Sequence, residues 1–276
     1  MSDPDEHTER LDPFGEPDTA TKRPVVVALF DVLGFSKRLE TFGLEAVVST
    51  YQQLIDSAVL KDADRCLGLK DDGTGRRFVV AFALPVRYAY FSDTILLWVP
   101  LEQLFAAPFV SRCANLVCEA LRLGVPLRGA IALGEAVMHK PTGIYIGAPI
   151  VEVARMEAAQ KWIGMAFGET ATWPPFLAEL DPKLIIEYDA PLKEHANDLI
   201  SPVVLDWPRR WRELYDCSPN EKLGEINAAT PHPYYENTMA FANYSSANED
   251  WHTLPEAETE NRKLRMRKVA ARDLIP

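Results

Sequence analysis

The stretch VVVALFDVLGFS, residues 25–36, indicates the fold of this chain more clearly than any other segment. Val25 to Phe30 form a continuous apolar run rich in β-branched residues, which is typical of a buried strand. Ser36 is a candidate N-cap for the helix that follows, which Gly43 is expected to interrupt. Asp31 ends the apolar run, and a carboxylate there is costly unless it has a partner. Asp31 is therefore a candidate functional residue.

The segments downstream of this strand predict alternating strands and helices. The sequence RYAYFSDTILLWV (residues 87–99) predicts a tight hairpin with Ser92 and Asp93 at its turn, and residues 101–123 predict an amphipathic helix. LRGAIALGEAV predicts a strand that ends near Gly134, and Pro149 opens a further helix. Polar residues 61–76 predict a loop. The order β-α-β-β-α-β indicates an α+β, ferredoxin-like fold, an antiparallel sheet with helices packed on one face.

Composition and charge limit the function classes. Lys and Arg number 29 against 40 Asp and Glu, which gives a net charge of −11 and a pI near 5.0. Such an acidic chain is not expected to bind nucleic acid or an anionic membrane through its overall field. The four cysteines form no CxxC, no apolar run reaches the length of a membrane span, and the N-terminus does not resemble a secretory signal. We therefore expect a cytoplasmic protein.

The chain divides by composition into three parts. Residues 1–23 are acidic and proline-containing with almost nothing to bury, which predicts a mobile tail. Residues 24–190 contain the predicted α/β elements and form the expected main domain. Residues 191–276 are rich in Trp, Pro and Asn without a clear period, and we expect them to form an extension packed on that domain.

Asp31 and Asp93 are the strongest candidates for chemistry. If their strands are neighbours, both carboxylates lie at one end of the sheet. Paired carboxylates suit Mg²⁺ or Mn²⁺, which prefer oxygen ligands and keep positions open for phosphate oxygens. The alternative is that Asp31 caps a turn and Asp93 is an ordinary turn residue.

Five segments in order resemble class III nucleotidyl cyclases. FDVLGFS resembles their FxDxxGFS/T signature, and FSDTILLWV resembles their GDxxL hairpin, with Ser92 where Gly is usual. LRGAIALGE, GAPIVEVARMEAA and IGMAFGETA are similar to the strand, helix and strand that follow in that family. The resemblance covers about residues 25–172 and favours the metal interpretation of Asp31 and Asp93. It implies that residues 24–190 form a nucleotidyl cyclase catalytic domain.

The resemblance implies a mechanism and a set of site residues. Two Mn²⁺ or Mg²⁺ ions per site would be held by Asp31, Asp93 and the backbone carbonyl of Val32, and Phe35 and Ser36 would contact the nucleoside triphosphate substrate. Arg155 falls on the family's transition-state arginine, which reaches in from a second chain. The resemblance therefore implies a homodimer with shared active sites, whereas the plainer alternative makes Arg155 a solvated helix residue.

The departures from the family pattern concern the base. Val151 stands where the family has Asn, and Ile144 stands near the position of the adenine-recognising Asp. The compact form resembles the stand-alone pyrimidine cyclases of the bacterial Pycsar anti-phage system, whose cyclic UMP or cyclic CMP activates a separate effector. Tyr51 is then a candidate uracil contact, or alternatively a core aromatic. Arg128 is interpreted as an exposed residue that opens a strand, or as a phosphate ligand.

These features favour a pyrimidine nucleotide cyclase that uses UTP, with CTP less favoured. One alternative is a conventional adenylate or guanylate cyclase. The other is a catalytically silent cyclase-like domain that binds nucleotide or protein.

Overall fold

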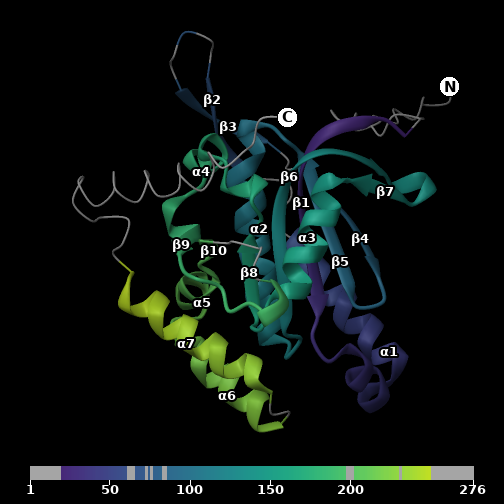
Figure 1. Ribbon diagram of the computed structural model, residues 1–276, viewed down its shortest axis with the longest axis vertical. Coiled ribbons are helices and arrows are strands. Elements are labelled where there is room, and N and C mark those ends of the chain that lie inside the picture. Colours follow the sequence, from purple (N-terminus) through teal and green to yellow (C-terminus); the bar gives the residue numbers. More distant parts are fainter. Residues whose placement is uncertain are drawn as a thin grey trace, which may run out of the picture.

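In the part of the chain that the structure describes, the main sheet has eight strands, and their spatial order differs from their order along the chain (Figure 1). The computed structural model describes residues 20–60, 66–71, 74, 77–82, 86–196, 202–229 and 232–249. In spatial order the strands are β4 (Arg87–Phe91), β5 (Thr94–Pro100), β1 (Lys22–Val32), β6 (Leu127–His139), β8 (Gly164–Phe167), β10 (Val203–Leu205) and β9 (Ile185–Glu187), with β7 (Ile144–Gly147) paired to β6.

The predicted α+β, ferredoxin-like fold is confirmed by the four strands around β1. The order β4-β5-β1-β6 is antiparallel at every pairing. Helix α1 (Phe35–Ile55) follows β1, and helix α2 (Gln103–Arg122) joins β5 to β6. Strand β8 adds to β6 in parallel, so the complete sheet is mixed. The physical reason is the intervening helix α3 (Ala148–Ala159), which carries the chain across the sheet between them.

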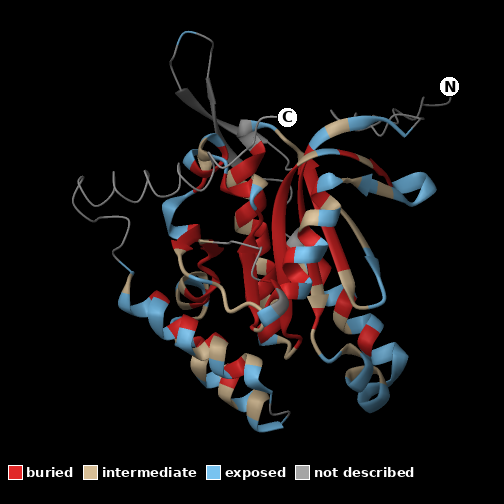
Figure 2. Ribbon diagram, in the orientation of Figure 1, coloured by how far each residue is buried: buried red, intermediate tan, exposed pale blue. Residues whose placement is uncertain are grey.

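The two faces of the sheet are covered by different helices. Alternate residues of β1, such as Val26 and Phe30, pack into one core with α1 and α2. Val25 and Val27 pack on the opposite face against α3. The predicted arrangement with helices on one face therefore describes α1 and α2, while α3 lies on the other face. Because side chains alternate along a strand, Asp31 shares the face of Val25 and Val27 that packs against α3. The central strands are almost entirely buried (Figure 2).

The C-terminal helices pack on this core through large aromatic side chains. The remaining helices are α4 (Pro174–Glu179), α5 (Trp207–Tyr215), α6 (Pro219–Ala229) and α7 (Pro233–Ala247). A π-helical segment, η1 (Asp56–Leu60), follows α1. Short 3₁₀ turns η2 to η5 span Lys140–Thr142, Thr170–Thr172, Pro182–Leu184 and Glu194–Ala196. Trp162, just before β8, and Phe241 on α7 stack edge to face at 4.6 Å. Strand β10 lies inside the main sheet, so the predicted extension contributes to the same core.

The structure corrects several local predictions. Cys66–Asp71 form β2, paired with β3 (Arg77–Phe82), because strand pairing overrides the polar sequence for which a loop was predicted. β6 continues past Gly134, whose φ of +153° lets the strand extend to His139. β1 begins at Lys22, inside the predicted tail, and residues 1–19 lie outside the described residues.

Two further local outcomes concern α1 and the membrane. The helix begins at Phe35 after Gly34, so the prediction of Ser36 as N-cap is wrong. The interruption at Gly43 is confirmed by its φ of +78°. In the part of the chain that the structure describes, no helix combines the length and apolar character needed to cross a membrane.

Candidate active site

Asp31 and Asp93 meet at one end of the sheet. Asp31 lies opposite Thr94 of β5 and opposite Arg128 of β6. Asp93 belongs to the two-residue turn between β4 and β5, and its carbonyl accepts a hydrogen bond from the Val32 N–H at 2.9 Å. The turn and the end of β1 are therefore fixed to each other by the backbone, as the sequence prediction required.

Ser92 takes the strained position of that turn. Its φ is +56°, in the left-handed region that favours glycine. This conformation explains why glycine suits the position, and it costs serine a steric penalty in return for the tight turn. The turn sets where the neighbouring Asp93 carboxylate lies.

Arg128 is the nearest cation to Asp31, and the prediction that it is exposed is wrong. Its side chain is buried, with Nη2 donating to Asp31 Oδ2 at 3.2 Å and Nε donating to Glu157 Oε1 at 2.5 Å. Burial is favourable because each charged nitrogen has an acceptor. The physical cause of the error is the pairing of β6 with β1 and β8 on both sides, which places Arg128 under α3.

The site holds more negative than positive charge. Burial raises the pKa of Asp31, Arg128 opposes that rise, and the nearby Asp93 charge adds to it. Burial also raises the pKa of Glu157, again opposed by Arg128. Because the charge of Asp93 helps to raise the pKa of Asp31, a cation placed between the two carboxylates would lower their energy.

The donor set fits a divalent cation of the magnesium or manganese type. The oxygens available are those of Asp31 and Asp93 with the Val32 backbone, and such oxygens suit Mg²⁺ and Mn²⁺. Within the described ranges, no group of three or more His, Cys, Asp or Glu side chains could hold a metal. A cation here would therefore rely on two side chains and leave its other positions for backbone, water or substrate oxygens.

The N-terminus of α1 lies directly after this strand end. Gly34 is its N-cap, in the left-handed conformation with φ +73°, and no side chain caps the helix. The first turn contains no acidic residue. Phe35 is half-buried and Ser36 is exposed in that turn. The first N–H groups of a helix lack intrahelical partners and favour anions, so this end suits phosphate.

Tyr51 of α1 lies in the core beside these groups. Its ring packs edge to face with Phe35 and with Tyr90, at centroid distances of 6.1 and 6.5 Å. The hydroxyl is buried, and it has no hydrogen-bond partner among the described residues. Burial raises the pKa of Tyr51, and the charge of Asp93 raises it further. The hydroxyl is therefore an unsatisfied donor close to the paired carboxylates.

Arg155, Val151 and Ile144 lie on the outside of the molecule. Arg155 and Val151 are exposed on α3, and Ile144 is exposed on β7. Arg155 is two residues before Glu157, so the two side chains leave the helix roughly 200° apart. Because Glu157 contacts Arg128 under the helix, Arg155 points away from Asp31 of its own chain. The structure does not bring Arg155 to the paired carboxylates within one chain.

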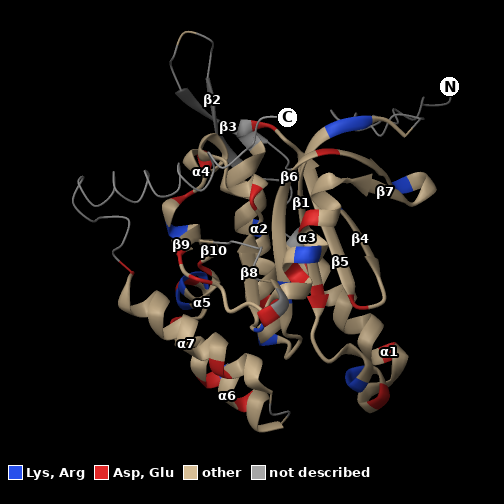
Figure 3. Cartoon of the chain, viewed as in Figure 1, with Lys and Arg blue, Asp and Glu red and all other residues tan. Residues whose placement is uncertain are grey.

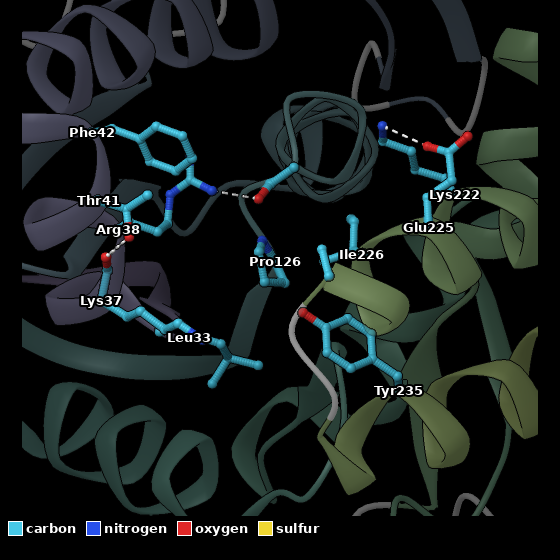
Figure 4. A pocket seen from close by; sticks show the side chains of 13 residues that line it. Leu33, Lys37, Arg38, Thr41, Phe42, Pro126, Lys222, Glu225, Ile226 and Tyr235 are labelled. Atoms are coloured by element: carbon cyan, nitrogen blue, oxygen red, sulfur yellow. Dashed lines mark hydrogen bonds and ion pairs between the residues drawn. The ribbon is translucent and has the colours of Figure 1, made fainter.

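A cavity of about 460 Å³ lies beside the site but is separate from its carboxylates (Figure 4). Its walls include Lys37 and Arg38 of α1, Pro126 before β6, and Lys222 and Tyr235 of the C-terminal helices. Arg38 donates to the Gly124 carbonyl at 2.7 Å, and Lys222 pairs with Glu225 at 3.0 Å. Asp31, Asp93 and Tyr51 do not line it.

The chain matches no protein-family model and none of the curated proteins. Among solved structures it is similar to the guanylyl cyclase Cya2, with 16% identity, 67% of this chain and 91% of that chain covered, and a TM-score of 0.43. It is also similar to the adenylyl cyclase CyaB from P. aeruginosa, with 11% identity, coverage of 67% and 94%, and a TM-score of 0.42. The guanylate cyclase domain of RhGC from Catenaria anguillulae in complex with GTP has 10% identity, coverage of 67% and 97%, and a TM-score of 0.43. The chemistry assigned to this chain rests on its own residues.

Sequence analysis missed Glu157 and Gln160. The Gln160 side chain accepts from the Trp162 indole at 2.6 Å and donates to the Gly129 carbonyl at 2.8 Å. The backbone carbonyl of Gln160 accepts from Arg128 at 3.0 Å. The helical spacing of Val153, Met156 and Glu157 places a carboxylate on the buried side of α3. A charged residue on that side, together with Arg128 inside an apolar strand, could have predicted the pair.

Proposed function

We propose that this chain is a metal-dependent nucleotidyl cyclase that converts UTP, and less readily CTP, to the 3′,5′-cyclic nucleotide and pyrophosphate. The observation that carries the proposal is the meeting of Asp31 and Asp93 at the end of the sheet, where the Val32 N–H is bonded to the Asp93 carbonyl. The uncapped N-terminus of α1 begins immediately beyond them. Paired carboxylates next to free helix amides form a place where cations and a phosphate chain are both favoured.

Each residue has a distinct part in the proposed reaction. Asp31, Asp93 and the Val32 carbonyl would hold two Mn²⁺ or Mg²⁺ ions, which when bound lower the pKa of the ribose 3′-hydroxyl and neutralise phosphate charge. The backbone N–H groups of Phe35 and Ser36 would orient the triphosphate. Such reactions depend mainly on positioning and charge neutralisation, which fixed backbone and carboxylate groups supply.

The proposed enzyme is a homodimer with shared sites. Arg155 is exposed and leaves α3 away from its own Asp31, so it would serve the site of a second chain. A guanidinium there would stabilise the charge that develops on the transferred phosphate. Exposed apolar side chains of Ile144, Ile146 and Val151 lie on β7 and α3 near Arg155, and they would be covered by the second chain.

The preference for a pyrimidine is supported by what the chain offers to a base. Ile144 and Val151 are apolar and cannot hydrogen-bond an adenine ring. Tyr51 has a buried hydroxyl to which the described residues offer no hydrogen-bond partner, and this hydroxyl would contact the base edge. The cyclic product would act on a separate effector in anti-phage defence, as the sequence resemblance implies.

The test is an incubation of purified protein with each of the four nucleoside triphosphates and Mn²⁺, with cyclic products resolved by mass. Cyclic UMP should form fastest and cyclic CMP next, and Asp93→Asn should form none. Faster production of cyclic AMP or cyclic GMP would favour a conventional adenylate or guanylate cyclase. No cyclic product from any triphosphate would favour the silent nucleotide-binding domain.

A further inference from the structure

Arg128 is held by three acceptors from two elements. Nε donates to Glu157 Oε1 at 2.5 Å, Nη1 donates to the Gln160 carbonyl at 3.0 Å, and Nη2 donates to Asp31 Oδ2 at 3.2 Å. The first two acceptors belong to α3 and its C-terminal end, and the third belongs to β1. Charges of both signs gather on α3 and at the strand ends beside it (Figure 3).

The contacts to α3 are the shorter and more deeply buried ones. The side chains of Arg128 and Glu157 are each 10% exposed, whereas that of Asp31 is 23% exposed. A guanidinium is planar, so two anchored nitrogens fix the direction of the third. Arg128 is therefore fastened to α3, and only its outer nitrogen reaches Asp31, at the longest of the three distances.

The way in which Arg128 distributes its hydrogen bonds between α3 and Asp31 determines how readily Asp31 can bind another cation. Asp31 and Glu157 interact with each other and share Arg128. Asp31 also interacts with the charge of Asp93 and, more weakly, with that of Lys193. If Glu157 lost its charge, Arg128 would turn toward the remaining carboxylate, because an unpaired buried guanidinium is costly. A cation approaching Asp31 would then have to displace a stronger ion pair.

We propose that Glu157 is a positioning residue that holds Arg128 against α3 and so keeps the Asp31 carboxylate free to bind a divalent cation. The inference rests on the proposed function, in which Asp31 is a metal ligand. It gives Glu157 a role in the site although Glu157 is not itself a ligand. Partners of this kind commonly change metal affinity 10- to 100-fold when they are removed.

The first experiment is a titration of the full chain with Mn²⁺, in which free Mn²⁺ is followed by electron paramagnetic resonance. Glu157→Gln should weaken Mn²⁺ binding about 10-fold. The matched control is Glu152→Gln on the same helix, whose half-buried carboxylate accepts from the Thr170 N–H at 3.0 Å and hydroxyl at 2.8 Å. The control should keep the wild-type affinity within about twofold.

A rescue separates positioning from a general loss of structure. Arg128→Gln added to Glu157→Gln removes the competing guanidinium, so Mn²⁺ affinity should return toward the wild-type value. Glu157→Asp keeps the charge and should retain most of the affinity. Wild-type affinity in Glu157→Gln, or a double variant as weak as Glu157→Gln alone, would overturn the inference.

A metal-free measurement distinguishes this inference from the proposed function. Urea unfolding of Asp31→Asn, Glu157→Gln and the double variant should be non-additive, because both carboxylates share Arg128. Additive changes would overturn the sharing of Arg128 whether or not the chain is a cyclase. A wild-type protein that binds no Mn²⁺ would instead overturn both the metal-dependent function and the role of Glu157 in it.

Discussion

Asp31, which is partly buried, and Asp206, which is fully buried, differ in ways that separate a candidate site from a structural anchor. Asp206 precedes α5 and is fully buried, and its Oδ1 accepts from the Ser245 hydroxyl at 2.5 Å and the Arg209 N–H at 3.3 Å. Burial raises the pKa of Asp206, as it does that of Asp31. Asp31, however, lies at an open strand end and is close to a second carboxylate. A pKa raised by burial is therefore common to Asp31 and Asp206. What distinguishes Asp31 as a candidate site is the nearby second carboxylate and the partial exposure of its side chain.

The largest expected effect comes from removing either charge of the carboxylate pair. Asp31→Asn or Asp93→Asn should lower cyclic nucleotide formation by at least about 100-fold, because metal stabilisation of the transition state is worth several kcal/mol. The fold should survive, since relief of repulsion between the two carboxylates offsets the lost contacts. Initial rates measured by mass spectrometry, with melting curves on the same samples, test both parts.

Asp206→Asn is the matched comparison for that experiment. It removes the charge of a carboxylate that is fully buried, more so than Asp31, and the rate per folded molecule should stay within about twofold of wild type. Wild-type-like turnover in Asp31→Asn or Asp93→Asn would end the two-metal assignment. A large rate loss in Asp206→Asn would show that buried charge anywhere in the chain affects turnover.

Loss of the Asp206 carboxylate should instead lower the stability of the fold. Asp206→Ala leaves the Ser245 hydroxyl and the Arg209 N–H without their acceptor, which should lower the free energy of unfolding by about 1–3 kcal/mol. Urea unfolding followed by circular dichroism measures that loss. An unchanged midpoint would mean that the C-terminal helices do not depend on this cap.

The pH dependence of the anchor has a definite sign. Because burial raises the pKa of Asp206, the folded state binds this proton more tightly than the unfolded state. Its contribution to stability is fully present below the ordinary aspartate pKa and is lost as the pH rises through the raised one. As the pH rises over that interval, the free energy of unfolding of the wild type should therefore fall relative to that of Asp206→Asn. A difference that is constant with pH would contradict the assignment.

The shared site can be tested by mixing two inactive chains. Equal amounts of Asp93→Asn and Arg155→Ala should pair at random, and each mixed dimer keeps one site with all its residues. About a quarter of the wild-type activity should return. Mixed dimers that form, as shown by native mass spectrometry, and yet remain inactive would contradict the partner role of Arg155.

The sequence predicted the places where local chemistry is decisive and missed those decided by tertiary pairing. The apolar run before Asp31 and the turn at Ser92 and Asp93 carry strong local preferences, so the meeting of the two carboxylates could be predicted. Arg128 and Glu157 are 29 residues apart, and only the packing of α3 on β6 brings them together. Ser36 has good N-cap chemistry, but Gly34, in the left-handed conformation, is the N-cap, so the helix starts two residues earlier than an N-cap at Ser36 would give.

The smallest expected effect concerns Tyr51, whose buried hydroxyl has no hydrogen-bond partner in the part of the chain that the structure describes. If that hydroxyl serves a uracil edge, Tyr51→Phe should lower the preference for UTP over ATP by about 2- to 10-fold, the value of one neutral hydrogen bond. The metal dependence should not change, because the carboxylates are untouched. Stability without ligand should stay equal or rise by about 1 kcal/mol, since an unsatisfied buried hydroxyl is removed.

Tyr215→Phe is the control, because the Tyr215 hydroxyl donates to Glu119 at 2.9 Å and its loss should lower stability without altering base preference. An unchanged ratio of cyclic UMP to cyclic AMP in Tyr51→Phe would make Tyr51 a core aromatic and remove it from the base site.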